Sequence, residues 1–156
     1  IARRQRQMCI RDRFLILTDI SSLTVPLGFM LGRIANFING ELYGRITQHP
    51  IGMIFPNGGN LPRHPSQLYE AFFEGIFLFV LLMFIATRNN KTGVLSGSFL
   101  IGYGLIRFFI EYFRQPDSHM GFVALQLSMG QLLSIPMVII GLLLLMKSLK
   151  KNEAIS

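Results

Sequence analysis

Four long apolar segments constrain this chain more than any other feature of its sequence. Each is close to the roughly 20 residues that a helix needs to cross the hydrocarbon core of a bilayer. Apolar residues make up 51% of the 156 residues and charged residues only 15%, which argues against an ordinary soluble domain. We therefore predict an all-α integral membrane protein, a polytopic helical bundle with about four transmembrane helices. The segments cover residues 14–38, 68–87, 93–113 and 129–146.

The first and last of these segments differ in how uniformly apolar they are. The first contains Asp19, Pro26 and Arg33 besides two serines, a polar load that would be costly if it faced lipid. The last is the most uniformly apolar, and we expect Pro136 to kink it.

The basic residues predict both the partner and the topology. The net charge of +7 and the pI near 10.2 would suit a nucleic acid, but the basic residues lie in short runs between apolar segments and not on one face or tail. We expect anionic membrane lipid as the partner and no nucleic acid. By the positive-inside rule both ends lie inside, and the loops 39–66 and 114–128 lie outside. The basic runs are residues 3–13, Arg88 with Lys91, and Lys147 with Lys150 and Lys151.

The start of the sequence differs from the rest. Residues 8–13, MCIRDR, resemble the translated read-through of a common sequencing-library adapter, so we expect residues 1–13 to be a basic stretch that is partly an artefact. The lone Cys9 lies in this stretch and cannot form an internal disulfide. We predict one membrane-embedded domain over residues 14–146 and a basic cytoplasmic tail over residues 147–156.

The exterior loop over residues 39–66 is rich in glycine and proline. Such a run cannot hold a regular helix, so we expect ordered turns or a short strand pair that caps the bundle. These residues are Gly40, Gly44, Pro50, Gly52, Pro56, Gly58, Gly59, Pro62 and Pro65.

The outer end of the first segment carries a dense group of polar residues. If the helix persists, Arg33, Asn36 and Gly40 fall at i, i+3 and i+7. An arginine at this depth can hold a lipid phosphate through two parallel hydrogen bonds. The alternative is a snorkelling arginine beside asparagines that cap a helix end. The nearby Glu41 and Arg45 favour a functional site.

A polar stripe follows the third segment. A buried pair of Arg107 and Glu111 could serve only as structural glue between helices. Each buried charge is expensive before it is paired, however, and contacts between apolar residues would avoid that cost. We therefore predict that Arg107 faces an interior cavity. The residues of the stripe are spaced 4, 4 and 3 apart, so they share one helix face: Tyr103, Arg107, Glu111 and Arg114.

The start of the second segment has a largely structural explanation. Ser66 suits an N-cap position. Glu70 and Glu74 share a face with Gln67 and lie near the positive end of the helix dipole. His64 can act as a general base near neutral pH, but a lone histidine in a proline-bounded turn more often has a positional role. No cluster of metal-ligating residues is evident, and we predict neither metal nor cofactor.

Several short blocks of this sequence resemble one family. Residues 32–44 read GRIANFINGELYG, and the pattern GRxANFxNxExxG is similar to the signature of the prolipoprotein diacylglyceryl transferases, which are bacterial membrane enzymes. The further blocks occur in family order and make the resemblance specific. They are residues 64–70 (HPSQLYE), 102–107 (GYGLIR), 111–117 (EYFRQPD) and 128–131 (SMGQ).

The resemblance implies a reaction. Family members take phosphatidylglycerol, and the thiol of a lipobox cysteine in a prolipoprotein signal peptide attacks the glyceryl carbon. This attack gives a thioether and releases glycerol phosphate. The resemblance also implies a multi-pass protein of the bacterial cytoplasmic (inner) membrane without metal or soluble cofactor. Full-length relatives have seven helices, so we expect this chain to be their C-terminal part.

The resemblance also implies roles for single residues. Arg33 and Arg107 match arginines associated with the lipid phosphate, and Glu111 is suited to orient Arg107. The family's proposed base lies in a His-Gly-Gly motif that this chain lacks, so we expect little or no turnover from the chain alone. The expected catalytic residues are Arg33, Asn36, Glu41, Arg107 and Glu111, and the expected substrate-binding residues are Arg33, Asn39, Gly44, His64, Tyr103 and Arg107.

Two other classes remain open. A fragment of an anion transporter or channel could line its path with Arg33, Arg107 and Arg114. A non-catalytic membrane scaffold could use the same polar stripe for helix association. Anion flux through liposomes without lipid chemistry would favour the transporter.

Overall fold

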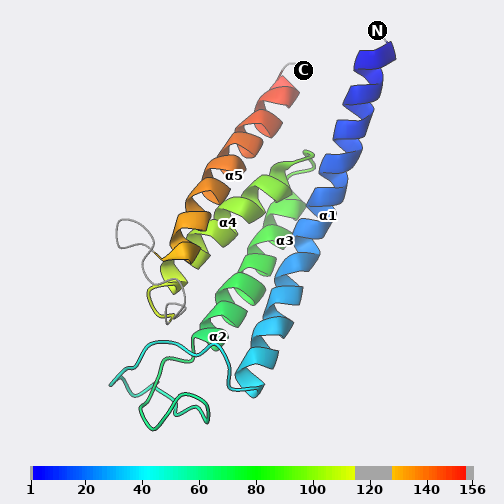
Figure 1. Cartoon of the computed structure of the whole chain (residues 1–156). Coiled ribbons are helices and arrows are strands. Elements are labelled where there is room, and N and C mark those ends of the chain that lie inside the picture. Colours follow the sequence, from blue (N-terminus) through cyan, green and yellow to red (C-terminus); the bar gives the residue numbers. More distant parts are fainter. Residues whose placement is uncertain (1, 115–127, 154–156) are drawn as a thin grey trace.

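The chain folds into a bundle of long helices joined at one end by an irregular loop (Figure 1). The computed structural model describes the backbone of residues 2–114 and 128–153, and the side chains of residues 13–114 and 128–150. The α2, η1 and α3 segments form one continuous helix, in which η1 is π-helical. The elements are α1 (Ala2–Ile38), α2 (Ser66–Glu70), η1 (Ala71–Phe77), α3 (Leu78–Arg88), α4 (Val94–Ile110) and α5 (Met129–Glu153).

The prediction of an all-α polytopic membrane protein is confirmed. Three stretches are long and apolar enough to cross a bilayer: Arg13–Ile38, Ser66–Arg88 and Met129–Lys150. The fourth predicted crossing is shorter than expected, because α4 has only 17 residues. At about 1.5 Å per residue α4 is roughly 26 Å long, slightly less than the roughly 30 Å of a hydrocarbon core. The chain leaves the helix after Ile110 because its next residues bond to the loop, where the Phe113 carbonyl accepts from the Arg45 N–H at 3.0 Å.

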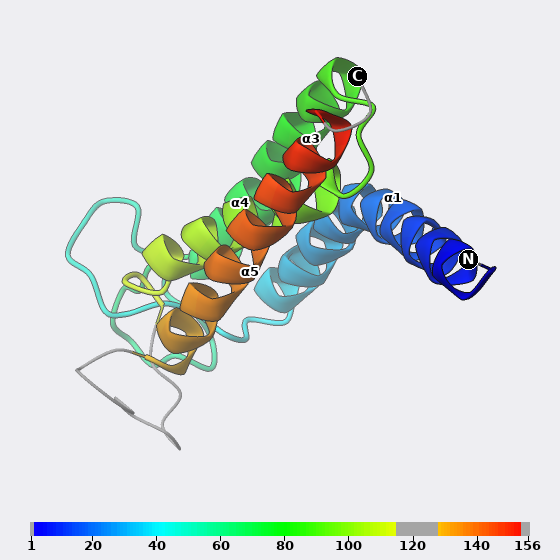
Figure 2. The ribbon, with the colours of Figure 1, turned by 90° about the horizontal axis from the view of Figure 1, so that it is seen from above.

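The helices pack in a definite order. Among the described elements, α5 packs against α4 alone, whereas α1 contacts α2, η1, α3 and α4 (Figure 2). Glycines allow α4 and α5 to approach closely, since a Cβ atom on Gly97 of α4 would lie 3.0 Å from the Gly141 carbonyl oxygen of α5. Small residues of this kind let transmembrane helices approach backbone to backbone.

The start of α1, the end of α5 and the turn between α3 and α4 lie at one end of the bundle, opposite the loop over residues 39–65 (Figure 1). A hydrogen bond of 2.5 Å from the Ser148 hydroxyl to the Thr92 carbonyl joins α5 to this turn. The basic runs that the sequence assigns to the cytoplasmic side therefore share one end of the molecule.

Asp19 explains much of the polar load in the first segment. Its carboxylate is 8% exposed and accepts hydrogen bonds from the Gly93 N–H at 2.6 Å and the Ser96 N–H at 2.8 Å. The Ser96 hydroxyl also donates to it at 2.6 Å. Because α4 begins at Val94, this carboxylate of α1 caps the N-terminus of α4, where a negative charge is favourable.

The first and last helices run through their prolines. Pro26 lies inside α1 and Pro136 inside α5, and both helices continue beyond them. The first helix also begins at Ala2, so it starts 12 residues before the predicted first segment at Phe14.

The exterior loop consists of ordered turns with isolated bridges, one of the two forms predicted for it. Met53 and Arg63 exchange backbone hydrogen bonds of 2.9 and 2.8 Å. The prediction of Ser66 as an N-cap is wrong, because Pro65 holds the cap position and Ser66 is the first helical residue. The Ser66 hydroxyl instead donates to the Leu42 carbonyl at 3.2 Å, which ties the helix start to the loop.

We expect the substitution Gly141→Ala to lower the free energy of unfolding by about 1–3 kcal/mol, a typical cost of overpacking. The added Cβ would meet the Gly97 carbonyl oxygen at 2.9 Å and the Ile101 Cγ1 at 2.8 Å. Unfolding in mixed detergent micelles, followed by circular dichroism, measures the change. Gly28→Ala in α1 is the matched control, because no atom lies within 4 Å of its new Cβ. Equal losses in both variants would contradict the close packing of α4 and α5.

Candidate functional site

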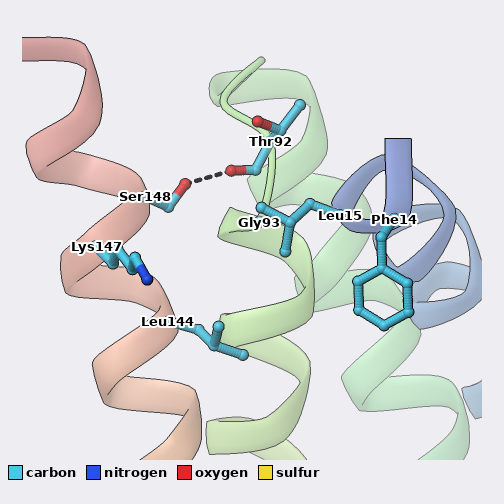
Figure 3. Close-up of a pocket in the computed structure, with 7 residues that line it drawn as sticks. All are labelled: Phe14, Leu15, Thr92, Gly93, Leu144, Lys147 and Ser148. Atoms are coloured by element: carbon cyan, nitrogen blue, oxygen red, sulfur yellow. Dashed lines mark hydrogen bonds between the residues drawn. The ribbon is translucent and has the colours of Figure 1, made fainter. Parts of the chain in front are cut away.

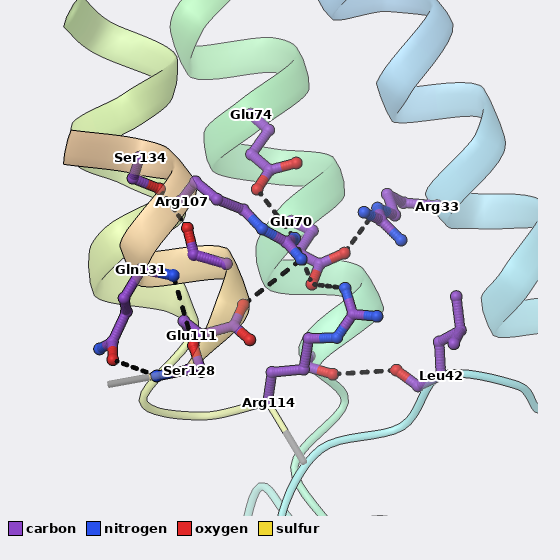
Figure 4. A network of polar contacts seen from close by, with 12 residues as sticks. Arg33, Leu42, Glu70, Glu74, Arg107, Glu111, Arg114, Ser128, Gln131 and Ser134 are labelled. Carbon is purple, nitrogen blue, oxygen red and sulfur yellow. Dashed lines mark hydrogen bonds and ion pairs between the residues drawn. The ribbon is translucent and has the colours of Figure 1, made fainter. Parts of the chain in front are cut away.

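Six charged side chains meet at the end of the bundle that carries the loop (Figure 4). They come from α1, from the α2 and η1 helix, and from α4 with the turn that follows it. Three are arginines and three are glutamates, so their formal charges balance. We call them the buried charge cluster: Arg33, Glu70, Glu74, Arg107, Glu111 and Arg114.

Glu70 is the centre of the cluster. Glu70 is 1% exposed, and its two carboxylate oxygens face arginines from three parts of the chain. Arg33 Nε lies 2.5 Å from Oε2, while Arg107 Nη1 and Arg114 Nη1 lie 3.1 and 3.6 Å from Oε1. A buried carboxylate is tolerated only when it is paired in this way. Glu70 therefore ties α1 and the end of α4 to the helix that starts at Ser66.

Arg107 contacts three carboxylates. Besides Glu70, its Nη1 lies 3.4 Å from Glu74 Oε1 and its Nη2 lies 3.3 Å from Glu111 Oε2. Its side chain is 15% exposed. Arg107 thus faces the bundle interior and not lipid, and its pair with Glu111 is present, whereas the cavity expected beside it stays a prediction.

Arg33 is bound much less completely than Arg107. A guanidinium group has five N–H donors, and only Nε of Arg33 is paired, with Glu70. Among the described residues the Arg33 side chain has no other hydrogen bond or ion pair. The remaining donors belong to a side chain that is 19% exposed, so Arg33 can accept an anionic ligand without giving up its contact with Glu70.

Three buried acceptor oxygens have no hydrogen bond to the described residues: Gln67 Oε1, Glu74 Oε2 and Glu111 Oε2, although Glu111 Oε2 has its ion pair with Arg107. Buried polar atoms are nearly always hydrogen-bonded, so such atoms call for an explanation. A bound group with hydroxyl or N–H donors would satisfy them. The site thus combines unused donors on Arg33 with unused acceptors on its neighbours.

The start of α5 supports Glu111. Ser128 and Gln131 form a reciprocal cap, in which the Ser128 N–H donates to Gln131 Oε1 at 3.1 Å and the Gln131 N–H donates to Ser128 Oγ at 3.3 Å. Between them lies Gly130, where a Cβ atom would be 2.7 Å from Glu111 Oε2. The block SMGQ therefore starts α5 and leaves the space that the Glu111 carboxylate occupies.

The remaining candidates of the 32–44 block lie beside the cluster and not within it. The α1 helix ends at Ile38, so Asn36 is in its last turns and Gly40, with φ +66°, lies beyond it. The Asn36 carbonyl accepts from the Glu41 N–H at 3.0 Å, which closes the turn. The side chains of Asn39 and Glu41 are exposed, and the Glu41 carbonyl accepts from Gln67 Nε2 at 2.6 Å.

Gly44, His64 and Tyr103 also surround the cluster. A Cβ on Gly44 would lie 2.6 Å from the Phe113 carbonyl oxygen, so only glycine allows this close approach of the backbone. His64 Nδ1 lies 3.3 Å from the Tyr69 hydroxyl, and no ion pair or hydrogen bond joins its side chain to the charge cluster in the described structure. Tyr103 packs between Phe29 and Phe99 one turn before Arg107.

Glu70, Glu74 and Arg114 were not among the expected catalytic or substrate-binding residues, although Arg114 was part of the predicted polar stripe. The interpretation of the two glutamates through the helix dipole is incomplete, because both are buried partners of arginines. The available signal was the shared face of Gln67, Glu70 and Glu74 in an apolar helix, since buried carboxylates require cations. Residues 115–117 of the block EYFRQPD lie outside the described residues.

Two further features concern metal binding and the cavities of the bundle. Among the described side chains, no group of three or more histidine, cysteine, aspartate or glutamate residues is arranged to hold a metal ion. A cavity of about 220 Å³ lies at the opposite end of the bundle, between α1, α5 and the turn before α4 (Figure 3). Its lining is mainly apolar and includes none of the candidate residues.

We expect Glu70→Gln to lower the free energy of unfolding by about 3–5 kcal/mol, the cost of leaving buried charges unpaired. The substitution keeps the shape of the side chain but removes the charge that three arginines share. Unfolding in detergent measures the loss. The control is Glu41→Gln, the same change at an exposed carboxylate, which should leave stability nearly unchanged. A loss no larger than that of the control would contradict the central role of Glu70.

Comparisons with known proteins agree with the motif blocks. The family model described as prolipoprotein diacylglyceryl transferase matches residues 2–147. A phosphatidylglycerol–prolipoprotein diacylglyceryl transferase of Rickettsia akari is 59% identical over 139 residues, which are 86% of this chain and 53% of the relative. The proteins of the same name from Geobacter sulfurreducens and Idiomarina loihiensis are 54% and 49% identical, over 83% and 88% of this chain and 50% and 52% of the relatives.

This chain spans about half the length of the curated relatives that it matches. The match nevertheless includes nearly all of the described structure, and the buried charge cluster lies within it. The predicted resemblance is confirmed, and the chain belongs to the prolipoprotein diacylglyceryl transferase family.

Proposed function

We propose that this chain supplies the phosphatidylglycerol-binding part of a transferase of the bacterial cytoplasmic membrane. The enzyme moves the diacylglyceryl group of phosphatidylglycerol to the thiol of a lipobox cysteine in a prolipoprotein signal peptide. The relatives' names indicate both substrates, phosphatidylglycerol and prolipoprotein. The proposal rests on one observation about Arg33. Its Nε is paired with Glu70, whereas the N–H donors of its two terminal nitrogens have no partner among the described residues.

Arg33 binds the lipid phosphate in this proposal. Arg33 lies five residues before Ile38, the last residue of a membrane-spanning stretch, and this position suits a headgroup and not the acyl chains. Its planar guanidinium can donate two parallel hydrogen bonds to phosphate oxygens. Glu70 fixes the orientation of the guanidinium through Nε and leaves the terminal nitrogens for the ligand.

The reaction places new charge on this phosphate. The cysteine sulfur forms a bond to the glyceryl carbon, and the bond from that carbon to the phosphate oxygen breaks. The leaving glycerol phosphate takes the electron pair, so its phosphate becomes more negative as the bond breaks, and the thiol proton leaves to a base. A cation near this oxygen stabilises the transition state more than the ground state.

Arg107 acts through its neighbours. Its two terminal nitrogens face Glu70, Glu74 and Glu111, so it is a positioning residue that keeps Glu70 directed at Arg33. The unpaired acceptors Gln67 Oε1 and Glu74 Oε2 complement a headgroup with hydroxyl groups, and the glycerol of phosphatidylglycerol carries two.

An anion transporter or channel is not favoured. The three arginines that would line its path are each paired with Glu70. The curated relatives are named as transferases.

We expect little or no product from the chain alone, but phosphatidylglycerol-dependent addition of diacylglyceryl to a lipobox cysteine peptide by a chimera that completes it, and we expect Arg33→Ala to abolish this addition. Mass spectrometry of the peptide after incubation with the chain in phosphatidylglycerol vesicles measures the product. Because the chain spans half of its relatives, the same residues are also tested as a chimera that replaces the matching segment of the Rickettsia akari relative. Arg88→Ala is the control, since Arg88 is exposed and lies at the other end of the bundle.

The chimera makes the result decisive. Product from the chimera that disappears with Arg33→Ala and persists with Arg88→Ala supports the proposal. An inactive chimera beside an active parent enzyme would contradict it, as would anion flux without product. A chimera that remains fully active with Arg33→Ala would remove Arg33 from phosphate binding.

We expect Gly130→Ala to lower the transfer rate of the chimera by up to about 100-fold while the fold remains intact. The three atoms nearest to the new Cβ all belong to the end of the flexible Glu111 side chain, which must move away from Arg107. Small displacements of this kind can cost two orders of magnitude in rate. The transfer rate of the double variant Gly130→Ala with Glu111→Gln should fall no further than that of Glu111→Gln alone, because both substitutions disrupt the same contact between Glu111 and Arg107. Additive losses would contradict the link, and Gly28→Ala is the control.

A further inference from the structure

The exterior loop carries apolar side chains that face outward. The loop has a buried residue of its own, Phe55, which is 5% exposed and packs against the rings of Phe37 and Tyr43 at 6.0 and 5.7 Å. Its other large apolar side chains are between 43% and 67% exposed. We call them the loop apolar surface: Leu42, Ile46, Ile51, Met53, Ile54 and Leu61.

An ordered backbone holds these side chains outward. Met53 and Arg63 exchange two backbone hydrogen bonds, and the Thr47 N–H donates to the Pro62 carbonyl at 2.9 Å. The Tyr43 hydroxyl donates to the Asn57 carbonyl at 2.9 Å, which closes the loop around Phe55. The exposure of the loop apolar surface is therefore a feature of a folded loop.

Beyond Glu41, the charges of the loop have one sign. No aspartate or glutamate lies between Glu41 and Glu70, whereas Arg45 and Arg63 lie within this stretch. Arg45 is exposed beside Ile46. Apolar and basic side chains without acidic ones are typical of segments that lie on anionic membranes.

The loop starts and ends at the membrane boundary. It connects Ile38 to Ser66, which are the ends of membrane-spanning stretches of 26 and 23 residues (Figure 1). At about 1.5 Å per residue these stretches are roughly 39 and 35 Å long, more than the roughly 30 Å core and less than the roughly 40–45 Å bilayer. Both ends of the loop thus lie in the headgroup layer.

We propose that the loop apolar surface inserts into the headgroup and upper acyl region of a leaflet rich in anionic phospholipid. Insertion stops at this depth, because irregular backbone is not tolerated in the hydrocarbon core. The exposed Arg45 pairs with the lipid phosphates, and the inserted loop holds the leaflet beside Arg33. This inference does not require the transfer reaction, so each can fail without the other.

The absence of tryptophan from the chain makes the test direct, because one introduced tryptophan reports one position. Ile54→Trp marks the loop apolar surface at its most exposed residue, and Gln48→Trp marks an exposed polar position of the same loop. Ile139→Trp, on the exposed face of α5, provides the reference for a position in contact with lipid. Each variant is reconstituted in vesicles of phosphatidylcholine with or without phosphatidylglycerol, using lipids brominated near the top of the acyl chains.

We expect bromolipid to quench Ile54→Trp about twofold more than Gln48→Trp, and acrylamide to quench it correspondingly less. The bromolipid quenching should weaken when phosphatidylglycerol is left out. Equal acrylamide quenching of both loop variants would place the surface in water and overturn the proposal. Protection of Ile54→Trp from acrylamide and bromolipid together would also overturn it, because protein would then cover the loop. Circular dichroism confirms that each variant folds.

Discussion

The burial of Glu70 is the constraint on which the rest of this structure depends. A carboxylate inside a membrane bundle must be neutralised, and here arginines from α1, from α4 and from the turn after α4 approach it together. Apolar contacts between membrane helices have little directional preference, whereas an ion pair fixes which faces meet. The cluster therefore sets the relative positions of α1, α4 and the helix between them, and it also holds the loop, because Arg45 Nε donates to the Arg114 carbonyl at 2.9 Å.

A second polar contact at the other end of the bundle completes this arrangement. Asp19 of α1 caps α4 through Gly93 and Ser96, 14 residues before Arg33 in the sequence. At about 1.5 Å per residue the two contact points on α1 are roughly 21 Å apart. Because Asp19 holds the start of α4 and Arg33 holds Glu70 of α2, α1 cannot slide or rotate past these helices without breaking a buried charge contact. Arg33 and Arg107 consequently face Glu70 from fixed directions.

The sequence predicted the fold class and half of the charge cluster for physical reasons. Apolar segments of membrane length and the polar stripe of Tyr103, Arg107 and Glu111 are local patterns, and local patterns can be read from one chain. The partners of Arg107 on another helix are not local, so Glu70 and Glu74 received a helix-dipole explanation and Asp19 none. The early end of α4 was equally hidden, because the residues that follow it bond to the distant loop, where Arg45 donates to the carbonyls of Phe113 and Arg114.

The neutrality of the cluster bears on how the proposed reaction can turn over. A site with unpaired arginines would bind the phosphate of the lipid and of the leaving glycerol phosphate strongly, and tight binding of both ground states does not raise the rate. In the buried charge cluster three glutamates offset three arginines, so the attraction for a singly charged phosphodiester is moderate. The additional charge on the leaving phosphate then meets donors of Arg33 that are already oriented by Glu70. In the proposed reaction, the glutamates would thus tune the arginines toward the transition state and allow the product to leave.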